Sequence, residues 1–592
     1  MENKNIYIGH RYVPKIIGVH DSTRTYEGLS IVTHEGTSYT SKKYVPEGVS
    51  ITNDEFWVVT GNYNVQVEHY RNEVNQIKKS HDSIIKDISD GQINHDNLKN
   101  DYEKSKVKLN NLSYGVFNVL DYNMTIDGTT DNTNDLKTII NDISENGGGI
   151  LEIPYHTNDI ITSESLYLPS NITINGNGNT IKCMSTKNET TPLYFVNKEN
   201  IYINNLNING MKELKDNQIS ASGGSNGITF SNQCRNIVIS NCHIYNTLEH
   251  GISFLSRMTN DRKRIEHCEN IVVDNCLFEN NGNKHFPAGR RGAGIMCYFG
   301  VLNIKIVNNT FKDFVAVGNY IDSAYSSKKQ LEEIAPNLRV DDDHYMGDNT
   351  IINGNTYIMT VDHWENTNSQ AGVGIVLHGQ KKALVSNNII NLDIGKYRGM
   401  SISNGQEDSN TRDILVVGNR INVTNYGIEI SNSQFVKIFN NYIRSINEVV
   451  IYNRTIDRQT HDIYILNNVI ENTNTKEGIF LDNLSEGKFK LENIFINDNI
   501  INFYNKGNNS GIYVKGGCKL TVAKNNTISN GIYGIRLDSL NDDIIVTQNT
   551  IIGCNTGVYA IGKGIVEFNT FLNCEKALGL NTITPSYNVI KE

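Results

Sequence analysis

Carboxylate-bearing residues in the middle of this 592-residue chain could cleave a glycosidic bond. We predict Asp322, Asp362 and Glu365 as catalytic carboxylates. Two carboxyl groups can act as general acid and as nucleophile or base, and their separation decides whether the sugar configuration is retained or inverted. Such oxygens could instead hold Ca²⁺, but no EF-hand-like spacing is present, so we expect no required metal or cofactor and keep Ca²⁺ as the alternative. The wider acidic set also contains Asp341, Asp342, Asp343 and Asp348, with His344 and His363 beside it.

Two histidines stand at the ends of short strand-like segments and could transfer protons. Glu249 and His250 enter one such segment, and His378 leaves another further along the chain. A histidine with a carboxylate nearby can serve as acid and base. We therefore predict His250 and His378 as catalytic residues and Glu249 as a substrate-binding residue. A structural role for each of them is the alternative.

Basic and aromatic residues of the same region are candidates for substrate binding. Arginine forks suit the phosphate or carboxylate groups of an acidic polymer, whereas solvated loops paired with nearby acids are the alternative. Trp364 follows His363 on a polar segment, and we predict that both contact a sugar; a loop tucked onto the body is the alternative. The predicted anion-binding residues are Arg257, Arg264, Arg290 and Arg291, in a basic set with Arg262, Lys263 and Lys284.

Composition excludes several classes of protein. The 54 Lys and Arg residues against 64 Asp and Glu residues give a net charge of −10, which argues against a nucleic-acid partner or an anionic membrane surface. No apolar run of about 18 residues exists, so no membrane insertion is expected. The start, MENKNIYIGH, has no apolar core and predicts no signal peptide. The nine cysteines show no CxxC or zinc spacing, which predicts buried thiols in a chain that folds in a reducing cytoplasm.

A repeat that begins near residue 112 must position these residues. Its unit reads apolar–x–apolar, two polar residues usually containing Asn, x–apolar, a turn, and then Gly–apolar–x–apolar, as in RNIVISNCHI and HGISFLS. Three short strands that run the same way cannot pair within one unit, but stacked units pair each strand with its copies above and below. The pattern predicts an all-β fold, a parallel β-helix of twelve coils. One position per unit sets the register and should form a hydrogen-bonded ladder that also tolerates the left-handed backbone of a tight bend: Cys242, Cys276, Asn309, Asn355, Asn388, Asn419, Asn441, Asn468, Asn499, Asn526, Asn549 and Asn569.

Long inserts mark one face of this helix as the working face. They cover residues 256–268, 281–291, 318–348 and 359–371, and all flank the strand that begins with glycine. Extra loops on one face of a solenoid are typical of a binding face. We therefore expect a groove between residues 249 and 412, and surface drift is the alternative.

The N-terminal part of the chain has a different pattern. Residues 1–62 predict a small β-rich head, and residues 63–111 predict a helical neck with apolar positions such as Val67, Tyr70 and Val74 spaced by three and four. Such a neck suits a short coiled coil in a homotrimer, and a solvated linker helix is the alternative. Residues 112–592 are assigned to the β-helix, with a capping helix near 133–144.

The segment 114–154 resembles the beginning of pectate-lyase-like β-helices of bacteriophage tail spikes and appendages. The matching elements are Asn118–Tyr122, Asp127-Gly128, Asp131, Gly147–Gly149 and Pro154. The resemblance implies a right-handed, pectin-lyase-like parallel β-helix, although activity varies among such proteins. The head and neck are similar to the virion-anchoring ends of spikes from phages of Gram-positive hosts, and the Asn-, Ile- and Lys-rich composition fits a staphylococcal phage.

The resemblance implies a tail spike that is assembled in the host cytoplasm and works on the virion outside the bacterial cell. Its partners would be phage tail proteins, bound through the head, and a bacterial cell-wall glycan. We expect depolymerisation of teichoic acid or of capsule or exopolysaccharide, with hydrolysis favoured over elimination. A non-catalytic receptor-binding spike of the same shape is the alternative. A bacterial polysaccharide lyase or epimerase is the third hypothesis, and the head and neck count against it.

Overall fold

The structure is a computed structural model with two compact units, residues 1–113 and 114–592. It describes residues 15–62 of the first unit. In the second unit it describes residues 115–215, 225–258, 265–283, 292–322, 346–363, 372–403, 411–456, 460–473, 476–485, 489, 491–505, 507, 509–581 and 585–591.

The first unit contains a four-stranded sheet in the order β1-β2-β3-β4. The strands are β1 (Lys15–Val19), β2 (Ser30–His34), β3 (Thr37–Ser41) and β4 (Trp57–Asn62). β1 and β2 are parallel, and the other two pairs are antiparallel. A small core of Tyr26, Val32, Val45, Ile51 and Trp57 holds the sheet. The β-rich head is thus present, whereas its first 14 residues and the predicted neck, residues 63–111, lie outside the described residues.

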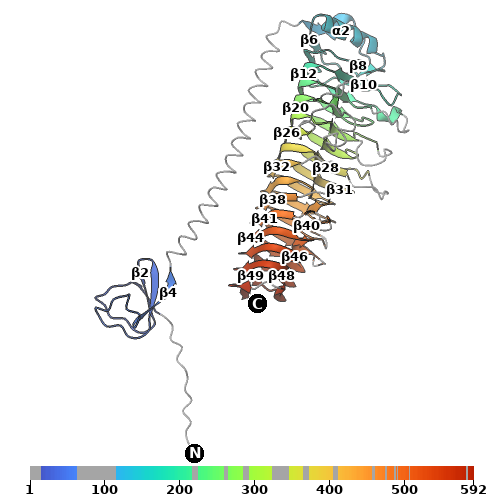
Figure 1. The fold of residues 1–592 in the computed structure, drawn as a ribbon. Coiled ribbons are helices and arrows are strands. Elements are labelled where there is room, and N and C mark those ends of the chain that lie inside the picture. Colours follow the sequence, from blue (N-terminus) through green and yellow to red (C-terminus); the bar gives the residue numbers. More distant parts are fainter. Residues whose placement is uncertain are drawn as a thin grey trace, which may run out of the picture. The chain divides into compact units, whose positions relative to one another are not determined.

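The second unit is a solenoid of three parallel strand rows, which the chain visits in the order A, B, C (Figure 1). Row A contains β5 (Val116–Asn118), β6 (Gly149–Glu152), β9 (Ile172–Asn175), β12 (Glu199–Asn204), β15 (Arg235–Ser240), β20 (Glu269–Asp274), β23 (Leu302–Val307), β26 (Gly347–Asn353), β29 (Gln380–Ser386), β32 (Arg412–Val417), β35 (Gln434–Phe439), β38 (Thr460–Leu466), β41 (Leu491–Asn497), β44 (Cys518–Lys524) and β51 (Pro585–Ser586).

Row B is a sixteen-stranded sheet. It contains β7 (Ile160–Thr162), β10 (Thr180–Cys183), β13 (Asn207–Asn209), β16 (His243–Tyr245), β21 (Leu277–Glu279), β24 (Thr310–Lys312), β27 (Thr356–Ile358), β30 (Ile389–Leu392), β33 (Arg420–Val423), β36 (Tyr442–Ser445), β39 (Val469–Asn472), β42 (Ile500–Phe503), β45 (Thr527–Ser529), β47 (Thr550–Ile552), β49 (Thr570–Leu572) and β52 (Val589–Lys591).

Row C contains strands most of which have a glycine just before them or among their first three residues. They are β8 (Leu166–Tyr167), β11 (Leu193–Val196), β14 (Ile228–Ser231), β17 (Ile252–Leu255), β22 (Ala293–Tyr298), β25 (Val317–Ile321), β28 (Gly372–His378), β31 (Tyr397–Ser403), β34 (Ile428–Ser431), β37 (Ile451–Thr455), β40 (Ile479–Asn483), β43 (Ser510–Lys515) and β50 (Lys576–Asn581). The long strands β46 (Tyr533–Thr547) and β48 (Thr556–Glu567) run from row C into row A without a break.

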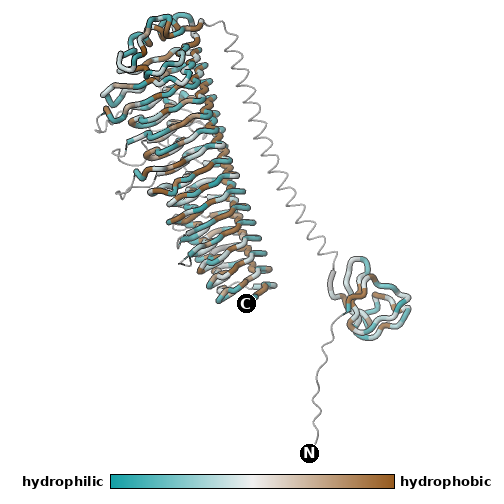
Figure 2. The backbone as a smooth tube through the Cα atoms, turned by 180° about the vertical axis from the view of Figure 1, so that it is seen from behind, coloured by the Kyte–Doolittle hydropathy of each residue, from teal (hydrophilic) through white to brown (hydrophobic). Residues whose placement is uncertain are grey.

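Between the two ends of the solenoid, each coil buries at least one side of its strands. Residues at equivalent positions stack in register, as Ile244, Phe278 and Phe311 do in row B, and these side chains are fully buried. Because successive side chains of a strand point to opposite faces, apolar and polar residues alternate along the coils (Figure 2). The parallel β-helix predicted from the repeat is therefore correct. Its row B has sixteen strands where the repeat pattern revealed twelve coils.

The asparagine ladder runs through the interior of the tight turn between rows A and B. The Nδ2 of Asn441 donates to Oδ1 of Asn468 over 3.0 Å and to the carbonyl of Val416 over 3.0 Å, and the backbone N–H of Asn441 donates to the same Oδ1. This pattern continues to Asn588, one coil beyond the predicted set. Each amide thus satisfies buried backbone groups of two coils at once.

The left-handed residue of this turn is the one before the ladder position, which corrects the expectation that the ladder residue itself has this conformation. Asn440, Asn467 and Asn525 have φ values of 55°, 52° and 54°, and Gly354 and Gly418 take the same place in other coils. Asparagine and glycine tolerate this backbone region best. The turn therefore needs two specialised residues, one for conformation and one for hydrogen bonding.

The glycine that precedes the row C strands is required by packing. A Cβ atom on Gly294 would lie 2.4 Å from the ring of Phe311, and one on Gly318 would lie 2.5 Å from the carbonyl oxygen of Gly374. Row C therefore approaches the next coil closely at this position, which is glycine in most coils, although Val450 and Ala577 take the same place in two of them.

The β-helix begins with the predicted capping helix and the turn that precedes it. A 3-10 turn, η1 (Val119–Tyr122), leads to α2 (Thr133–Glu145), which buries Leu136, Ile139 and Ile143 against the first coils. Asp127 accepts hydrogen bonds from the backbone N–H groups of Thr129 and Thr130, which hold the pKa of its carboxyl well below the usual range. Asp127 therefore stabilises this turn.

All nine cysteines are free thiols, and all but Cys574 are buried, as the sequence predicted. No helix among the described residues is long and apolar enough to cross a membrane. Two smaller elements complete the unit: η2 (Lys212–Leu214), and an antiparallel hairpin of β18 (Arg257–Met258) and β19 (Ile265–Glu266).

Candidate functional site

The four predicted inserts all flank row C. Two of the inserts follow the strands β17 and β25, and the other two precede the strands β22 and β28. The outward side chains of these strands form one surface, here called the row C outer face. One stacked position on this face contains Ser253, Met296, Tyr320 and Val376 in successive coils. The position two residues further along the strands contains Leu255, Tyr298, Asp322 and His378.

Three polar groups meet on this face at the ends of β25 and β28. The hydroxyl of Tyr320 lies 3.1 Å from Nδ1 of His378, and Oδ1 of Asp322 lies 4.0 Å from the same nitrogen. The side chains of His378 and Asp322 are 18% and 11% exposed, so both are largely shielded from water but reachable. The phenol and the imidazole are within hydrogen-bond reach of each other, the carboxylate lies just beyond it, and side chains of these three kinds can transfer protons. We call these residues the Tyr320 triad.

An apolar patch adjoins the triad. Ala293, Met296, Val317, Val373 and Val376 point outward from row C and are nevertheless buried, as is most of Tyr320. This cluster is separate from the main core. The triad therefore lies beside a buried apolar cluster, where hydrogen bonds and electrostatic interactions are stronger than in water.

His250 and Glu249 lie at the opposite end of the row C strands. Nδ1 of His250 accepts a hydrogen bond from the backbone N–H of Ala293 over 3.1 Å, and both residues are buried. Three strand spacings separate β17 from β28, about 14 Å. His250 and His378 therefore share a face but are not partners in one proton-transfer group.

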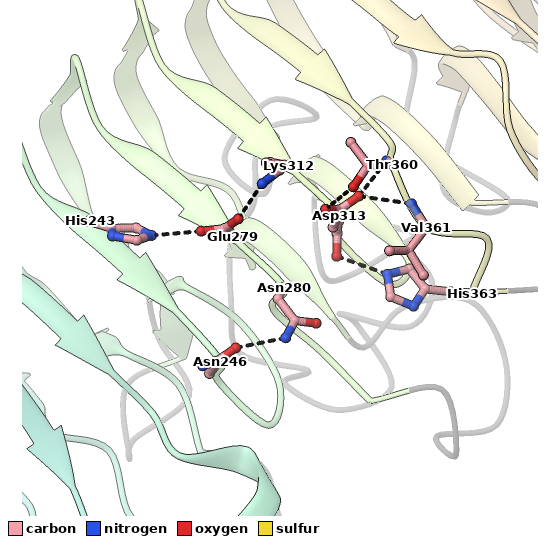
Figure 3. Close-up of polar contacts among 9 residues, drawn as sticks. All are labelled: His243, Asn246, Glu279, Asn280, Lys312, Asp313, Thr360, Val361 and His363. Carbon is pink, nitrogen blue, oxygen red and sulfur yellow. Dashed lines mark hydrogen bonds and ion pairs between the residues drawn. The ribbon is translucent and has the colours of Figure 1, made fainter.

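Asp362 and His363 lie in the turn between β27 and β28 (Figure 3). Nε2 of His363 donates to the backbone carbonyl of Asp313 over 3.0 Å, and the Asp313 carboxylate accepts from Thr360 N–H and Oγ1 over 2.6 and 2.7 Å. Burial lowers the pKa of His363. His363 thus holds the turn together, and Asp362 packs beside Gly395, where a Cβ atom would lie 2.6 Å from Oδ1 of Asp362.

The predicted acidic cluster is divided in the structure. Asp362 lies before β28 and Asp322 beside its last residue, and the strand Gly372–His378 spans about 20 Å at about 3.3 Å per residue. Paired carboxylates of glycosidases are about 5–10 Å apart. Asp322 and Asp362 therefore do not form such a pair, and Asp348 lies on row A, because the turns of the helix send neighbouring sequence segments to different faces.

Several predicted residues lie outside the described residues: Glu365, Trp364, Arg264, Arg290 and Arg291. Arg257 is exposed on the β18–β19 hairpin, opposite Glu266 in register. Among the described residues, no group of three or more His, Cys, Asp or Glu side chains could hold a metal ion.

Tyr320 is not among the predicted residues, although the alternation of VGNYI places it on the outward side of its strand. The row C outer face also continues toward the C-terminus, beyond the predicted groove. There Glu429 joins Arg398 and Arg454 at 2.5 Å each. Below them, the rings of Tyr452, Phe480 and Tyr513 stack at 5.3 and 4.7 Å between centroids. Repeated outward aromatic residues one coil apart were the available signal.

The fold is also shown by comparison with known proteins. A family model described as right handed beta helix region matches residues 456–590, which identifies the solenoid as right-handed. The SPbeta prophage-derived uncharacterized protein YomE of Bacillus subtilis (strain 168) is 28% identical over 144 residues, 23% of this chain and 21% of that protein. The chain thus matches about a fifth of the length of this curated relative.

Solved structures resemble the chain at low sequence identity. The tailspike protein of E. coli bacteriophage HK620, solved as a double mutant in complex with a pentasaccharide, is 14% identical with a TM-score of 0.48, and the match covers 79% of this chain and 80% of that one. The pre-mature gene product 12 of bacteriophage phi29 is 15% identical with a TM-score of 0.47, with 76% and 64% covered. The A-module of the mannuronan C-5 epimerase AlgE4 of Azotobacter vinelandii is 13% identical with a TM-score of 0.40, with 81% and 100% covered.

Proposed function

We propose that this protein is a phage tail spike that binds a bacterial surface glycan along the row C outer face and cleaves it at the Tyr320 triad. The observation that carries the proposal is the convergence of Tyr320, Asp322 and His378 on the one face that all four long inserts flank. The similarity of a 144-residue segment to a prophage-derived protein supports a phage origin.

The triad can supply the proton transfers of glycan cleavage. In hydrolysis, an acid protonates the glycosidic oxygen while water attacks the anomeric carbon and gives its proton to a base. Asp322, with His378 beside it, is the proposed group for one of these two roles, and Glu365 is the proposed second carboxylate for the other. Arg264, Arg290, Arg291 and Trp364 are the proposed contacts to an acidic glycan, with Arg257 at the rim.

The Tyr320–His378 contact favours elimination as the second candidate reaction. His378 would remove the proton next to the carboxyl group of a uronic acid, and the electron pair of that C–H bond would form a C=C double bond. The leaving glycosidic oxygen would take the hydroxyl proton of Tyr320. Both groups lie 3.1 Å apart, so one sugar residue could contact both.

The substrates we propose are teichoic acid, or capsule or exopolysaccharide, of a staphylococcal host. The head would dock on the phage tail, and the neck would hold three copies together on the virion.

The test is to incubate the purified full chain with extracted teichoic acid and exopolysaccharide and to identify the new chain ends by mass spectrometry. Both reactions create a new reducing end, but hydrolysis adds the mass of one water for each bond cleaved, whereas elimination adds none and leaves an unsaturated non-reducing end that absorbs ultraviolet light. Tight binding with unchanged polymer length would instead indicate a non-catalytic receptor-binding spike, in which the residues of the Tyr320 triad contact the glycan.

A further inference from the structure

The row C outer face changes from polar to apolar within one coil above the Tyr320 triad. Along its central column, Thr229 and Ser253 are followed by Met296, Tyr320 and Val376, each paired with the next in strand register. Met296 is the first member of the apolar cluster in this column. Ser253 therefore lies at a boundary that a ligand group with one polar and one apolar end would match.

The hydroxyl of Ser253 has no hydrogen-bond partner among the described residues, although the side chain is only 1% exposed. The neighbouring hydroxyl of Thr229 differs, because it accepts a hydrogen bond from Nδ2 of Asn226 over 2.9 Å. Buried polar groups are nearly always hydrogen-bonded, so an unpartnered one needs an explanation. A ligand can hydrogen-bond to Ser253 without displacing a described protein group.

His250 adds a hydrogen-bond donor to the same coil. Its Nδ1 accepts from the backbone N–H of Ala293 over 3.1 Å, so this nitrogen carries no hydrogen. The neutral imidazole then has its hydrogen on Nε2, which can donate a hydrogen bond but cannot accept a proton. With this tautomer, His250 is suited to binding an acceptor atom of a substrate and not to acting as a general base.

Apolar side chains of the next coil lie beside these two polar groups. Met296 pairs with Ser253 in strand register and belongs to one cluster with Ala293, against which Tyr298 packs. The ring of Tyr298 meets that of His250 edge-to-face, with 6.2 Å between the centroids. Since Ser253 and His250 are only 1% and 2% exposed, a small substituent of a sugar, and not a whole ring, can reach them.

We propose that these five residues, here called the Ser253 site, bind the acetamido group of an N-acetylated amino sugar. This group has one carbonyl acceptor, one N–H donor and one methyl group. Nε2–H of His250 donates to the carbonyl oxygen, Oγ of Ser253 accepts from the N–H, and the methyl group packs on Met296 and Ala293. The inference rests on the proposed function, because it names the kind of sugar that the row C outer face selects.

The site lies close enough to the triad to determine which glycan is cleaved. Ser253 is two strand spacings from Tyr320, about 10 Å, so the acetamido sugar would be a near neighbour of the sugar at the triad. A site built to hydrogen-bond one substituent strongly rejects an analogue that lacks it, because the buried polar groups then have no partner. A hexose with a hydroxyl in place of the acetamido group should therefore bind poorly.

The test follows the methyl signal of Met296 by nuclear magnetic resonance in the full chain with isotope-labelled methionine methyl groups. Met296→Leu identifies this signal among the nine methionines, and Met400, in the core, is the internal reference. N-acetylglucosamine, N-acetylgalactosamine and N-acetylmannosamine are compared with glucose, galactose and mannose. We expect at least one N-acetylated sugar to shift the Met296 signal and its parent hexose to leave it in place. No shift with any sugar, or an equal shift with the parent hexose or its O-acetylated form, would overturn the proposal.

A serine variant tests the hydrogen bond itself. Ser253→Ala should lower the affinity for the N-acetylated sugar by about tenfold, the usual effect of losing one hydrogen bond. Ser529→Ala, on the outward side of row B, is the matched control with expected wild-type affinity. Unchanged affinity in Ser253→Ala would overturn the inference even if the triad cleaves a glycan. Selective binding of the N-acetylated sugar without any cleavage would support it and remove only the proposed enzyme activity.

Discussion

The hydroxyl of Tyr320 lies 3.1 Å from Nδ1 of His378, although the two residues are 58 positions apart in the sequence. They meet because β25 and β28 are neighbours in row C, where Tyr320 pairs with Val376 and Ile321 with Leu377. The insert between the strands can change in length without moving this contact, because the strand register fixes it. The proposed chemistry thus depends on the most regular part of the fold.

Removal of either proton-transfer group should abolish catalysis and spare binding. Tyr320→Phe and His378→Asn keep the shape of the side chains, and each should lower the rate of glycan cleavage by about 10²–10⁴-fold, the usual effect of losing a general acid or base. Thr550→Ala, on the outward side of row B and away from the row C outer face, is the control with expected wild-type rate. Rates come from the release of new chain ends, and affinity from calorimetry with a non-cleaved oligomer. Equal rates in all four proteins would remove the triad from the mechanism.

The asparagine ladder should contribute strongly to stability at each coil. Asn468→Ala removes Nδ2, which donates to the Ile438 carbonyl, and Oδ1, which accepts from the backbone N–H of Asn441. Both of these buried backbone groups therefore lose a partner. We expect a loss of about 2–4 kcal/mol in the free energy of unfolding, at about 1–3 kcal/mol per unsatisfied group. Asn467→Gly, at the adjacent left-handed position, should change it by less than about 1 kcal/mol. Urea denaturation of both variants measures the difference, and similar losses would contradict this division of roles.

His363 should make stability depend on pH. Burial lowers its pKa below 6.5, so between this lowered value and pH 6.5 the unfolded chain binds more protons than the folded one. Stability should therefore fall as the pH is lowered through this window. His363→Gln, which can still donate to the Asp313 carbonyl, should show a weaker pH dependence of the thermal midpoint. Parallel curves for wild type and variant between pH 7 and 5 would argue against a structural role for this histidine.

The cysteines should behave as interior side chains. All nine are free, eight are buried, and burial raises the pKa of Cys518 to about 12. We expect slow reaction of the native protein with a thiol reagent and nine equivalents after denaturation. Migration on a gel should be the same with and without reductant. Rapid modification of several thiols in the native state would contradict the tight packing of these coils.

The solenoid could be predicted from the sequence because equivalent positions of successive coils carry the same types of residue. Asn468 and its equivalents and the buried isoleucines recur from coil to coil, and a glycine recurs at the start of row C in most coils. The sequence predicted the site less well. Asp322 and Asp362 are similar in sequence context, but a strand of about 20 Å separates them, since row C lies between the two turns that carry them. Tyr320 was not predicted because an outward aromatic residue is recognised only when the strand register places it beside its neighbours.

The most direct test of the central claim compares wild type with His378→Asn on purified staphylococcal teichoic acid and exopolysaccharide, with polymer length followed by gel electrophoresis. The proposal predicts that wild type shortens one of these polymers and that the variant binds the same polymer without shortening it. Binding by wild type with no shortening of either polymer, or shortening by the variant at the wild-type rate, would contradict it.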